Sequence, residues 1–349
     1  MLIKAGATPR RAHGAGRFAI ELAAGHAPLS AELVARLSTM DGVEAVLDAE
    51  DPIPRVRAAT GPVVIATPRG PLAVGPGAPL ALAFGPCSIA LDPKAEDDLH
   101  QTAEAAARAG ARLLRGGAFK PRSSPYAFQG SGQDGLRLLR RIADAHQLAV
   151  VSEAISESAL NIVAEFAELV QLGARSMAST PLLKAAARCG RPLLLKRGFG
   201  ATVDEWLLAA EYLLDGGAPG VILCERGIRT FEPATRATLD LGGLALARLR
   251  TGLPILADPS HAAGTRPLVA PLALAAVAAG ADGLIVECHP DAARARSDGP
   301  QALALDELSP LAEAARAVAH AAGRRVEVSS KVTCPNKIQS SPRSSASPR

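Results

Sequence analysis

The segment from residue 114 to residue 130 combines three cations with glycines and hydroxyl groups, and it reads LRGGAFKPRSSPYAFQG. Arg115, Lys120 and Arg122 lie so close in the chain that they repel one another unless anions lie between them. A guanidinium binds phosphate or carboxylate through two parallel hydrogen bonds, whereas an ammonium acts as a point charge. The pair Gly116–Gly117 lets the backbone come close to a ligand. The segment therefore predicts an anion site, with a solvated basic loop or a nucleic-acid patch as the alternatives.

The distribution of charge argues against nucleic acid as the partner. The chain has 349 residues and a formal net charge of +4, from 38 basic and 34 acidic residues. Residues 329–349 hold four of the basic residues and no acidic one, so the remainder of the chain is neutral. This tail is rich in Ser and Pro with little to bury, and we expect it to be disordered.

Apolar strand-like segments alternate with helical segments from Leu80 onward. Eight such units in about 240 residues predict a parallel sheet covered by helices, and their number favours a closed (β/α)₈ barrel. An open doubly wound sheet is the alternative, but no glycine fingerprint follows the first strand. The predicted strands are Leu80–Phe84, Ala111–Leu114, Ala149–Ser152, Leu169–Leu172, Pro192–Leu195, Val221–Cys224, Pro254–Ala257 and Gly283–Val286.

Each predicted strand ends in a charged or metal-binding residue. In a (β/α)₈ barrel the carboxyl ends of all strands share one face, which carries the active site. A purely structural role would scatter such residues over the surface, so their shared position predicts a catalytic centre there. The residues are Cys87, Arg115, Glu153, Arg175, Lys196, Glu225 with Arg226, Asp258 with His261, and Glu287.

Four of these positions offer metal ligands of different kinds. Cys87, His261 and Glu287 supply sulfur, nitrogen and oxygen, and Asp298 lies in the loop after the eighth strand. This mixture suits a divalent transition ion such as Mn, Fe or Zn better than Mg or Ca. The spacing forms no compact metal motif, so a buried structural cysteine and a turn-capping aspartate are the alternatives.

The cations of this face exceed what one small anion would neutralise. We therefore expect two anionic groups at least, which two phosphorylated substrates would supply. The cations are Arg115, Lys120, Arg122, Arg175, Lys196, Arg226 and Arg236.

A series of segments in this order resembles the type I-beta class of 3-deoxy-D-arabino-heptulosonate 7-phosphate (DAHP) synthases, within the superfamily that also contains the 3-deoxy-octulosonate 8-phosphate synthases. The resemblance covers roughly residues 80–308 and implies a metal-dependent condensation of phosphoenolpyruvate with erythrose 4-phosphate, the first step of the shikimate route to aromatic amino acids. The segments are GPCS, LRGGAFKPRSSPYAFQG, QLGAR, LLKRG, CERGIRTFE, DPSHAAG, ADGLIVECHP and SDGPQ.

The resemblance implies a role for each candidate. Cys87, His261, Glu287 and Asp298 would hold a divalent ion such as Mn, Fe, Zn or Co, and Arg115, Lys120 and Lys196 would act at the reacting centre of phosphoenolpyruvate. Arg175 and Arg226 would bind the phosphate of phosphoenolpyruvate. Arg122 and Ser123 would bind the sugar phosphate, with Arg236 assisting them, and Glu153 would be a further substrate-binding residue. Either Lys120 or a metal-linked water would donate the proton.

Two other functions use the same residues. One is the sister reaction on arabinose 5-phosphate, whose enzymes carry a KANR-like sequence where this chain has Lys120-Pro121-Arg122. The other is a non-catalytic paralogue that binds sugar phosphates and regulates a partner such as a chorismate mutase. Loss of a metal ligand or of Lys196 would favour that paralogue, and the sequence has lost neither.

The N-terminal residues predict a smaller unit. Arg17–Leu22 and Val43–Leu47 have the pattern of strands, and Ser30–Met40 that of a helix, followed by Gly- and Pro-rich sequence that we expect to be a linker. We expect residues 1–75 to form a truncated ferredoxin-like segment, residues 76–325 the barrel, and residues 326–349 the tail. Five scattered cysteines and the absence of a long apolar run predict a cytoplasmic protein without membrane contact. The resemblance implies a dimer or a tetramer.

Overall fold

The computed structural model describes residues 8–11, 18–21, 31–41, 43, 46–47, 51–122 and 124–324. Ser123 and the predicted tail lie outside the described residues. Within these ranges, no helix is both long and apolar enough to cross a membrane.

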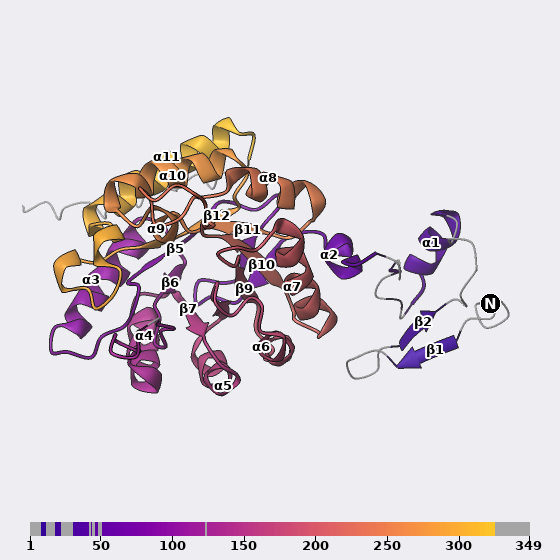
Figure 1. Ribbon diagram of the computed structural model, residues 1–349, viewed down its shortest axis with the longest axis horizontal. Helices are drawn as coiled ribbons and strands as arrows, with labels where there is room; N and C mark the ends of the chain where they lie inside the picture. The colour runs from indigo at the N-terminus through magenta and orange to yellow at the C-terminus, as the bar shows by residue number, and fades with distance from the viewer. Residues whose placement is uncertain are drawn as a thin grey trace, which may run out of the picture.

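Eight parallel strands form a closed barrel, as the sequence predicts (Figure 1). Each strand pairs with the next along the chain, and β12 pairs with β5 from Gly283↔Ala81 to Glu287↔Gly85, which closes the cylinder. Every residue in these eight strands is buried. The strands are β5 (Ala81–Gly85), β6 (Leu113–Arg115), β7 (Ala149–Ala154), β8 (Leu169–Leu172), β9 (Leu193–Lys196), β10 (Val221–Glu225), β11 (Ile255–Ala257) and β12 (Gly283–Glu287).

Helices surround the barrel and cover its outer surface (Figure 1). The main core lies between strands and helices, where Leu82 and Phe84 point outward from β5 while Ala81 and Ala83 face the interior. The helices are α3 (Ala95–Arg108), α4 (Gly132–Ala145), α5 (Glu157–Phe166), α6 (Thr180–Ala186), α7 (Val203–Asp215), α8 (Leu241–Arg250), α9 (Pro259–Ala263), α10 (Arg266–Ala278) and α11 (Leu308–Ala321), with short 3₁₀ turns η2 (Ala292–Arg294), η3 (Gly299–Gln301) and η4 (Leu305–Glu307).

Helix α7 shows how local sequence signals fix the geometry of the barrel. Thr202 accepts a hydrogen bond from the backbone of Glu205, whose side chain accepts one from the backbone of Thr202, so this capping box fixes the helix start. The buried Trp206 donates its indole hydrogen to the carbonyl of Leu195 at 3.1 Å. The helix is therefore fixed to β9 one residue before Lys196.

The segment that we expected to be a linker contains three elements. Helix α2 (Pro54–Ala58) lies on α7, where the Glu211 carboxylate accepts hydrogen bonds from the backbone of Arg55 at 3.0 Å and of Val56 at 2.8 Å. The strands β3 (Val63–Ile65) and β4 (Leu72–Val74) form an antiparallel hairpin. The Gly- and Pro-rich sequence of this stretch conceals these elements, and their packing partners are distant in the sequence.

The β3–β4 hairpin closes the amino-terminal end of the barrel. Its buried Ile65 and Val74 belong to the same apolar cluster as the residues at the strand starts, such as Ala81 and Leu113. Side chains fill the interior of a (β/α)₈ barrel, so this layer completes the interior core at that end.

Farther toward the amino terminus, β1 (Thr8–Arg11) pairs antiparallel with β2 (Phe18–Glu21), and α1 (Ala31–Ser38) follows; Figure 1 shows these elements to one side of the barrel. The predicted strand and helix at β2 and α1 are confirmed. The predicted strand at Val43–Leu47 is wrong in its described residues Val43, Val46 and Leu47, because a strand needs a partner and none pairs with them in the described chain. Sequence periodicity did not reveal β1.

The hairpin predicts a stability effect at one residue. Ile65→Ala should lower the free energy of unfolding by about 2–5 kcal/mol, because it leaves a cavity in a fully buried layer. Val64→Ala is the matched control, since Val64 is the adjacent residue and is 55% exposed, and it should change stability by at most about 0.5 kcal/mol. Denaturant unfolding measures both, and equal losses would refute the role of the hairpin.

Candidate functional site

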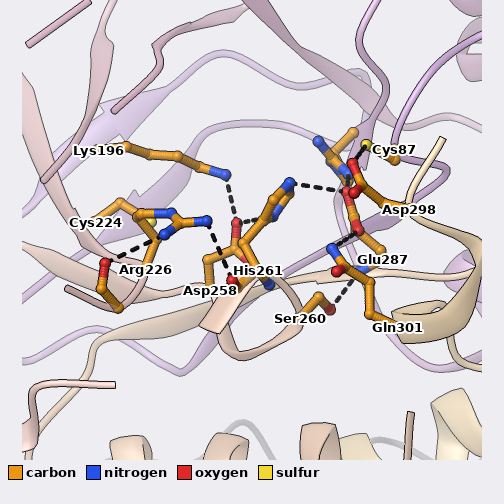
Figure 2. A network of polar contacts seen from close by, with 12 residues as sticks. Cys87, Lys196, Cys224, Arg226, Asp258, Ser260, His261, Glu287, Asp298 and Gln301 are labelled. Atoms are coloured by element: carbon orange, nitrogen blue, oxygen red, sulfur yellow. Dashed lines mark hydrogen bonds and ion pairs between the residues drawn. The ribbon is translucent and has the colours of Figure 1, made fainter. Parts of the chain in front are cut away.

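The carboxyl ends of the strands bring most of the predicted residues into one polar network, shown in Figure 2. Although the network is almost entirely shielded from water, it contains several full charges, such as Arg115, Lys196, Asp258 and Glu287. Charges that are buried in this way must be paired or must bind something charged. The network is therefore both a folding constraint and a candidate binding site.

The four predicted metal ligands form one cluster. Their donor atoms all lie within 4.8 Å of one another. Cys87 follows β5, His261 lies in α9, Glu287 ends β12, and Asp298 precedes η3 with a left-handed φ of 56°. The four residues come from the ends of β5, β11 (Ile255–Ala257) and β12, which are far apart in the sequence, so the absence of a compact motif reflects the barrel topology and not the absence of a site.

The orientation of His261 is set by a buried carboxylate. Asp258 accepts a hydrogen bond from Nδ1 of His261 at 2.7 Å and from its backbone N–H at 3.0 Å. Burial lowers the pKa of His261, and although Asp258 and Glu287 act to raise it, the net pKa is lowered. The neutral ring is therefore favoured. With the proton on Nδ1, the lone pair of Nε2 points toward Glu287 Oε1 at 3.3 Å.

Cys87 faces both a carboxylate and an ammonium. Its Sγ lies 2.8 Å from Asp298 Oδ2 and 3.1 Å from Nζ of Lys120. Burial, with Glu287 adding to it, raises the pKa of Cys87 to about 12, so the protein alone holds a thiol here. A divalent cation would reverse this balance, because a coordinated thiol loses its proton.

This donor set fits a divalent transition ion. A thiol, an imidazole lone pair and two carboxylates converge, and the Nε2 lone pair and Glu287 Oε1 are both acceptors unless a proton or a cation lies between them. Mixed sulfur, nitrogen and oxygen ligands match such ions better than Mg or Ca. The second nitrogen of His261 is held by Asp258, as is usual for metal-bound histidines.

Glu287 is held by three partners that leave it ionised. Arg115 donates to Oε1 at 2.7 Å, Gln301 donates to Oε2, and the Ser260 hydroxyl accepts from the Glu287 backbone at 3.0 Å. Burial raises the pKa of Glu287, but His261 and Arg115 outweigh it and the net pKa is lowered. The Nε atom of Arg115 is buried without a hydrogen-bond partner, so one donor of this guanidinium is unused.

Asp298 connects the cluster to Arg236. Arg236 donates to Asp298 Oδ1 at 2.7 Å and to Gln301 Oε1 at 2.8 Å. Burial opposes ionisation of Asp298, yet Cys87 and Arg236 hold the pKa of its carboxyl well below its usual range. A cavity of about 350 Å³ opens beside these residues, lined by Arg236, Gly264, Asp298 and Gln301 among others.

Lys120 contacts Cys87 of the cluster, and the charge of Glu153 acts on Lys120. Lys120 donates to the carbonyl of Cys87 at 3.2 Å; burial would lower its pKa, but Cys87 and Glu153 raise it, so the ammonium is kept. Glu153 accepts from Gln171 at 3.1 Å. A Cβ on Gly173 would come within 1.9 Å of Glu153 Oε1, so any other residue at that position would displace this carboxylate.

Lys196 forms an ion pair with Asp258, on the side of the network away from Cys87 (Figure 2). Arg226 lies nearby and donates to the carbonyls of Gly227 at 3.2 Å and His261 at 3.1 Å. Arg175 lies on an exposed turn after β8, and its guanidinium is 5.3 Å from the ring centre of Phe199. Arg226 lies 4.6 Å from the same ring centre, so the two predicted phosphate-binding arginines share one aromatic ring.

Arg122 lies on the loop between β6 and α4, where its Nε donates to the carbonyl of Phe128 at 3.1 Å. The other two nitrogens of its guanidinium have no hydrogen-bond partner within the described ranges of the chain. Its predicted partner Ser123 is outside the described residues.

Three residues of the network have roles that the sequence analysis did not assign. The sequence marks Asp258 only as a strand-end residue, and it does not mark Gln301 or Arg197 as site residues. Arg197 is buried and pairs with Glu225 Oε2 at 3.0 Å and Asp240 Oδ2 at 2.7 Å. The position of Arg197 directly after Lys196 was the available signal, because a second buried cation at a strand end requires its own acidic partners.

Comparison with known proteins assigns the family. The family model described as the DAHP synthetase I family matches residues 62–322. A curated phospho-2-dehydro-3-deoxyheptonate aldolase from Thermotoga maritima is 43% identical over 291 residues, which is 83% of this chain and 85% of the relative. A 2-dehydro-3-deoxyphosphooctonate aldolase from Desulfotalea psychrophila is 31% identical over 265 residues, covering 72% of this chain and 94% of the relative.

Solved structures agree with the sequence comparison. The crystal structure of the Thermotoga maritima DAHP synthase superposes with a TM-score of 0.73 at 38% identity and covers 93% of each chain. A truncated form of the Thermotoga maritima enzyme gives a TM-score of 0.69 at 43% identity, covering 76% of this chain and 96% of that one. The family model and the 43% identical relative show that the chain, with its closed parallel barrel and its cluster of four candidate metal ligands, belongs to the DAHP synthetase I family.

Proposed function

We propose that the chain is a metal-dependent DAHP synthase, which condenses phosphoenolpyruvate with erythrose 4-phosphate and water to DAHP and phosphate, the first step of the shikimate pathway. The observation that carries this proposal is the cluster of Cys87, His261, Glu287 and Asp298 at the carboxyl end of the barrel, surrounded by cations. The 43% identity to the Thermotoga maritima phospho-2-dehydro-3-deoxyheptonate aldolase supports the choice of substrates.

The reaction needs an electrophilic aldehyde and a fixed enol. A divalent ion, which we propose to be Mn, Fe, Zn or Co, supplies Lewis acidity toward an aldehyde oxygen when bound. Cys87, His261, Glu287 and Asp298 would hold it. The new carbon–carbon bond joins the enol carbon to the aldehyde carbon, water adds at the phosphate-bearing carbon, and phosphate leaves.

Arg115, Lys120 and Lys196 are placed to bind and orient phosphoenolpyruvate. Arg115 has one buried Nε hydrogen without a partner, which suits a carboxylate oxygen of the substrate. Holding the enol next to the aldehyde recovers part of the entropy cost of a two-substrate reaction. Lys120 stays charged at neutral pH because its pKa is raised, so it can deliver a proton to the developing alkoxide.

The remaining cations divide into two phosphate sites. Arg175 and Arg226, which share the ring of Phe199, would bind the phosphate of phosphoenolpyruvate. Arg122 and Ser123 would bind the sugar phosphate, and Arg236 would assist at the metal side, where it contacts Asp298. Glu153 would complete the substrate site by balancing the charge of Lys120.

Two alternatives have weaker support. Two relatives named 2-dehydro-3-deoxyphosphooctonate aldolase are 31% and 32% identical to this chain. Arabinose 5-phosphate is therefore the second candidate substrate. A non-catalytic regulatory paralogue is disfavoured because the four metal-ligand candidates and Lys196 are all present.

We further propose a cytoplasmic homo-oligomer, dimer or tetramer, with a chorismate mutase as a candidate partner. Exposed apolar side chains on neighbouring outer helices supply a surface for subunit contacts. These are Leu208 and Tyr212 on α7 and Leu246 and Leu249 on α8.

The proposed reaction is tested by phosphate release from phosphoenolpyruvate with Mn²⁺ present, with erythrose 4-phosphate or arabinose 5-phosphate as the second substrate. We expect turnover with the four-carbon sugar and its loss on addition of EDTA. Turnover with arabinose 5-phosphate alone would establish the second candidate. Binding of both sugars without phosphate release would favour the regulatory paralogue.

The metal cluster predicts the effect of Cys87→Ser. This variant should bind Mn²⁺ or Zn²⁺ at least about a hundredfold more weakly and lose most turnover, because a hydroxyl replaces the thiolate ligand. Metal content by elemental analysis and calorimetric titration measure the loss. Cys189→Ser is the control, since Cys189 lies after α6 and outside the network. Full metal binding by Cys87→Ser would refute the ligand assignment.

The division into two phosphate sites predicts the effect of Arg122→Ala. Its KM for erythrose 4-phosphate should rise about tenfold or more, with little change in the KM for phosphoenolpyruvate, because one charged hydrogen-bond donor is lost. Steady-state kinetics with each substrate varied in turn measures both constants. Arg137→Ala is the control, because Arg137 is exposed on α4 and pairs with Asp134. The opposite pattern of KM values would overturn the division.

A further inference from the structure

Three guanidinium groups surround the ring of Phe199, and the proposed function uses only two of them. The carbon atoms at the centres of these groups lie 4.6 Å from the ring centre for Arg226, 5.3 Å for Arg175 and 5.4 Å for Arg229. A cation is attracted to the face of an aromatic ring within about 6 Å of its centre. Arg229 is thus held at the same ring as the two proposed phosphate ligands.

None of the three arginines forms an ion pair with an acidic side chain in the part of the chain that the structure describes. Arg175 and Arg229 take part in none of its ion pairs, and Arg226 donates only to the carbonyls of Gly227 and His261. The two buried acids whose charges act on Arg226 are already paired, Asp258 with Lys196 and His261 and Glu225 with Arg197. Like charges held this close repel one another, so the arrangement favours an anion among them.

The loops that carry Phe199 and Arg229 are fixed to each other and to the barrel. The backbone of Arg229 donates to the carbonyl of Phe199 at 2.7 Å. Arg197 anchors the first loop by donating to the carbonyl of Ala201 at 2.9 Å, and it pairs with Glu225. Glu225 in turn accepts from the backbone of Gly227 at 2.7 Å, which anchors the second loop.

We propose that Arg229 is a third phosphate-binding arginine of this site and that Phe199 is a positioning residue that spaces the three guanidiniums. The inference rests on the proposed function, because the group that the three arginines bind is the phosphate of phosphoenolpyruvate. After the reaction they bind the released phosphate ion. A phosphate group carries up to two charges and several acceptor oxygens, so it matches three guanidinium forks better than a carboxylate does. The shared ring holds the forks in place before the anion arrives.

The contribution of Arg229 is tested with Arg229→Gln. Its KM for phosphoenolpyruvate and its inhibition constant for inorganic phosphate should both rise about tenfold, while its KM for erythrose 4-phosphate stays unchanged. Arg188→Gln is the matched control, because Arg188 is an exposed arginine just after α6, at the opposite end of the barrel. Unchanged constants for phosphoenolpyruvate and phosphate in Arg229→Gln would overturn the assignment.

The contribution of Phe199 is tested with a pair of variants. Phe199→Leu removes the aromatic face and should weaken phosphate binding by about threefold to tenfold, whereas Phe199→Tyr should restore it. A purely structural role would instead lower the thermal unfolding midpoint and kcat in Phe199→Leu without a selective change for phosphate. Equal behaviour of the leucine and tyrosine variants toward phosphate would refute the positioning role.

Calorimetric titration of the wild-type protein with inorganic phosphate separates this inference from the proposed reaction. Weaker phosphate binding in Arg229→Gln than in the wild-type protein supports the three-arginine site, whether or not phosphoenolpyruvate and erythrose 4-phosphate give turnover. An absence of turnover would refute only the proposed reaction. Turnover together with phosphate binding that is insensitive to Arg229 would leave the reaction standing and overturn the third arginine.

Discussion

One buried carboxylate holds the two halves of the site together. Asp258 is inaccessible to solvent, and its Oδ2 is shared by Nζ of Lys196 and Nδ1 of His261. Burial would raise the pKa of Asp258, but the adjacent His261 and Lys196 lower it well below its usual range, so it stays ionised. The charge fixes the tautomer of the proposed metal ligand and the position of the proposed substrate-binding lysine together. A change at this carboxylate therefore acts on both halves of the reaction.

The other buried charges follow the same logic of mutual dependence. Arg115 pairs with Glu287, and Arg197 with Glu225 and Asp240. Such pairs add little net stability, because removing both charges from water costs about as much as their attraction returns. Their value is positional, since neither partner can move without leaving the other unpaired. The site is thus preorganised by groups that are costly to bury, which is the arrangement that electrostatic catalysis requires.

Much of this arrangement follows from the sequence. The alternation of apolar strands and helices predicts the barrel, and the residues that end each strand predict Cys87, His261 and Glu287 on one face. What periodicity cannot predict is a contact between distant segments. The buried side of the β3–β4 hairpin is defined by its contact with the residues at the starts of the barrel strands. Likewise, the first backbone N–H groups of α2 are bound by Glu211, which lies far along the chain. Gln301 likewise gains its role only where η3 comes beside Glu287.

The amino-terminal end of the barrel contributes to stability and the carboxyl end carries the candidate site, and the two ends depend on each other. At the amino-terminal end, Ile65 and Val74 complete the apolar cluster of the barrel interior, which extends along β10 to Cys224, whose thiol pKa is raised by burial. One residue farther along β10 the network of charges begins, with Glu225 and Arg226. Because water is excluded below this level, the charges above it act through a low effective dielectric and interact strongly. The hairpin that closes the bottom of the barrel is therefore part of what gives the charges at the top their strength.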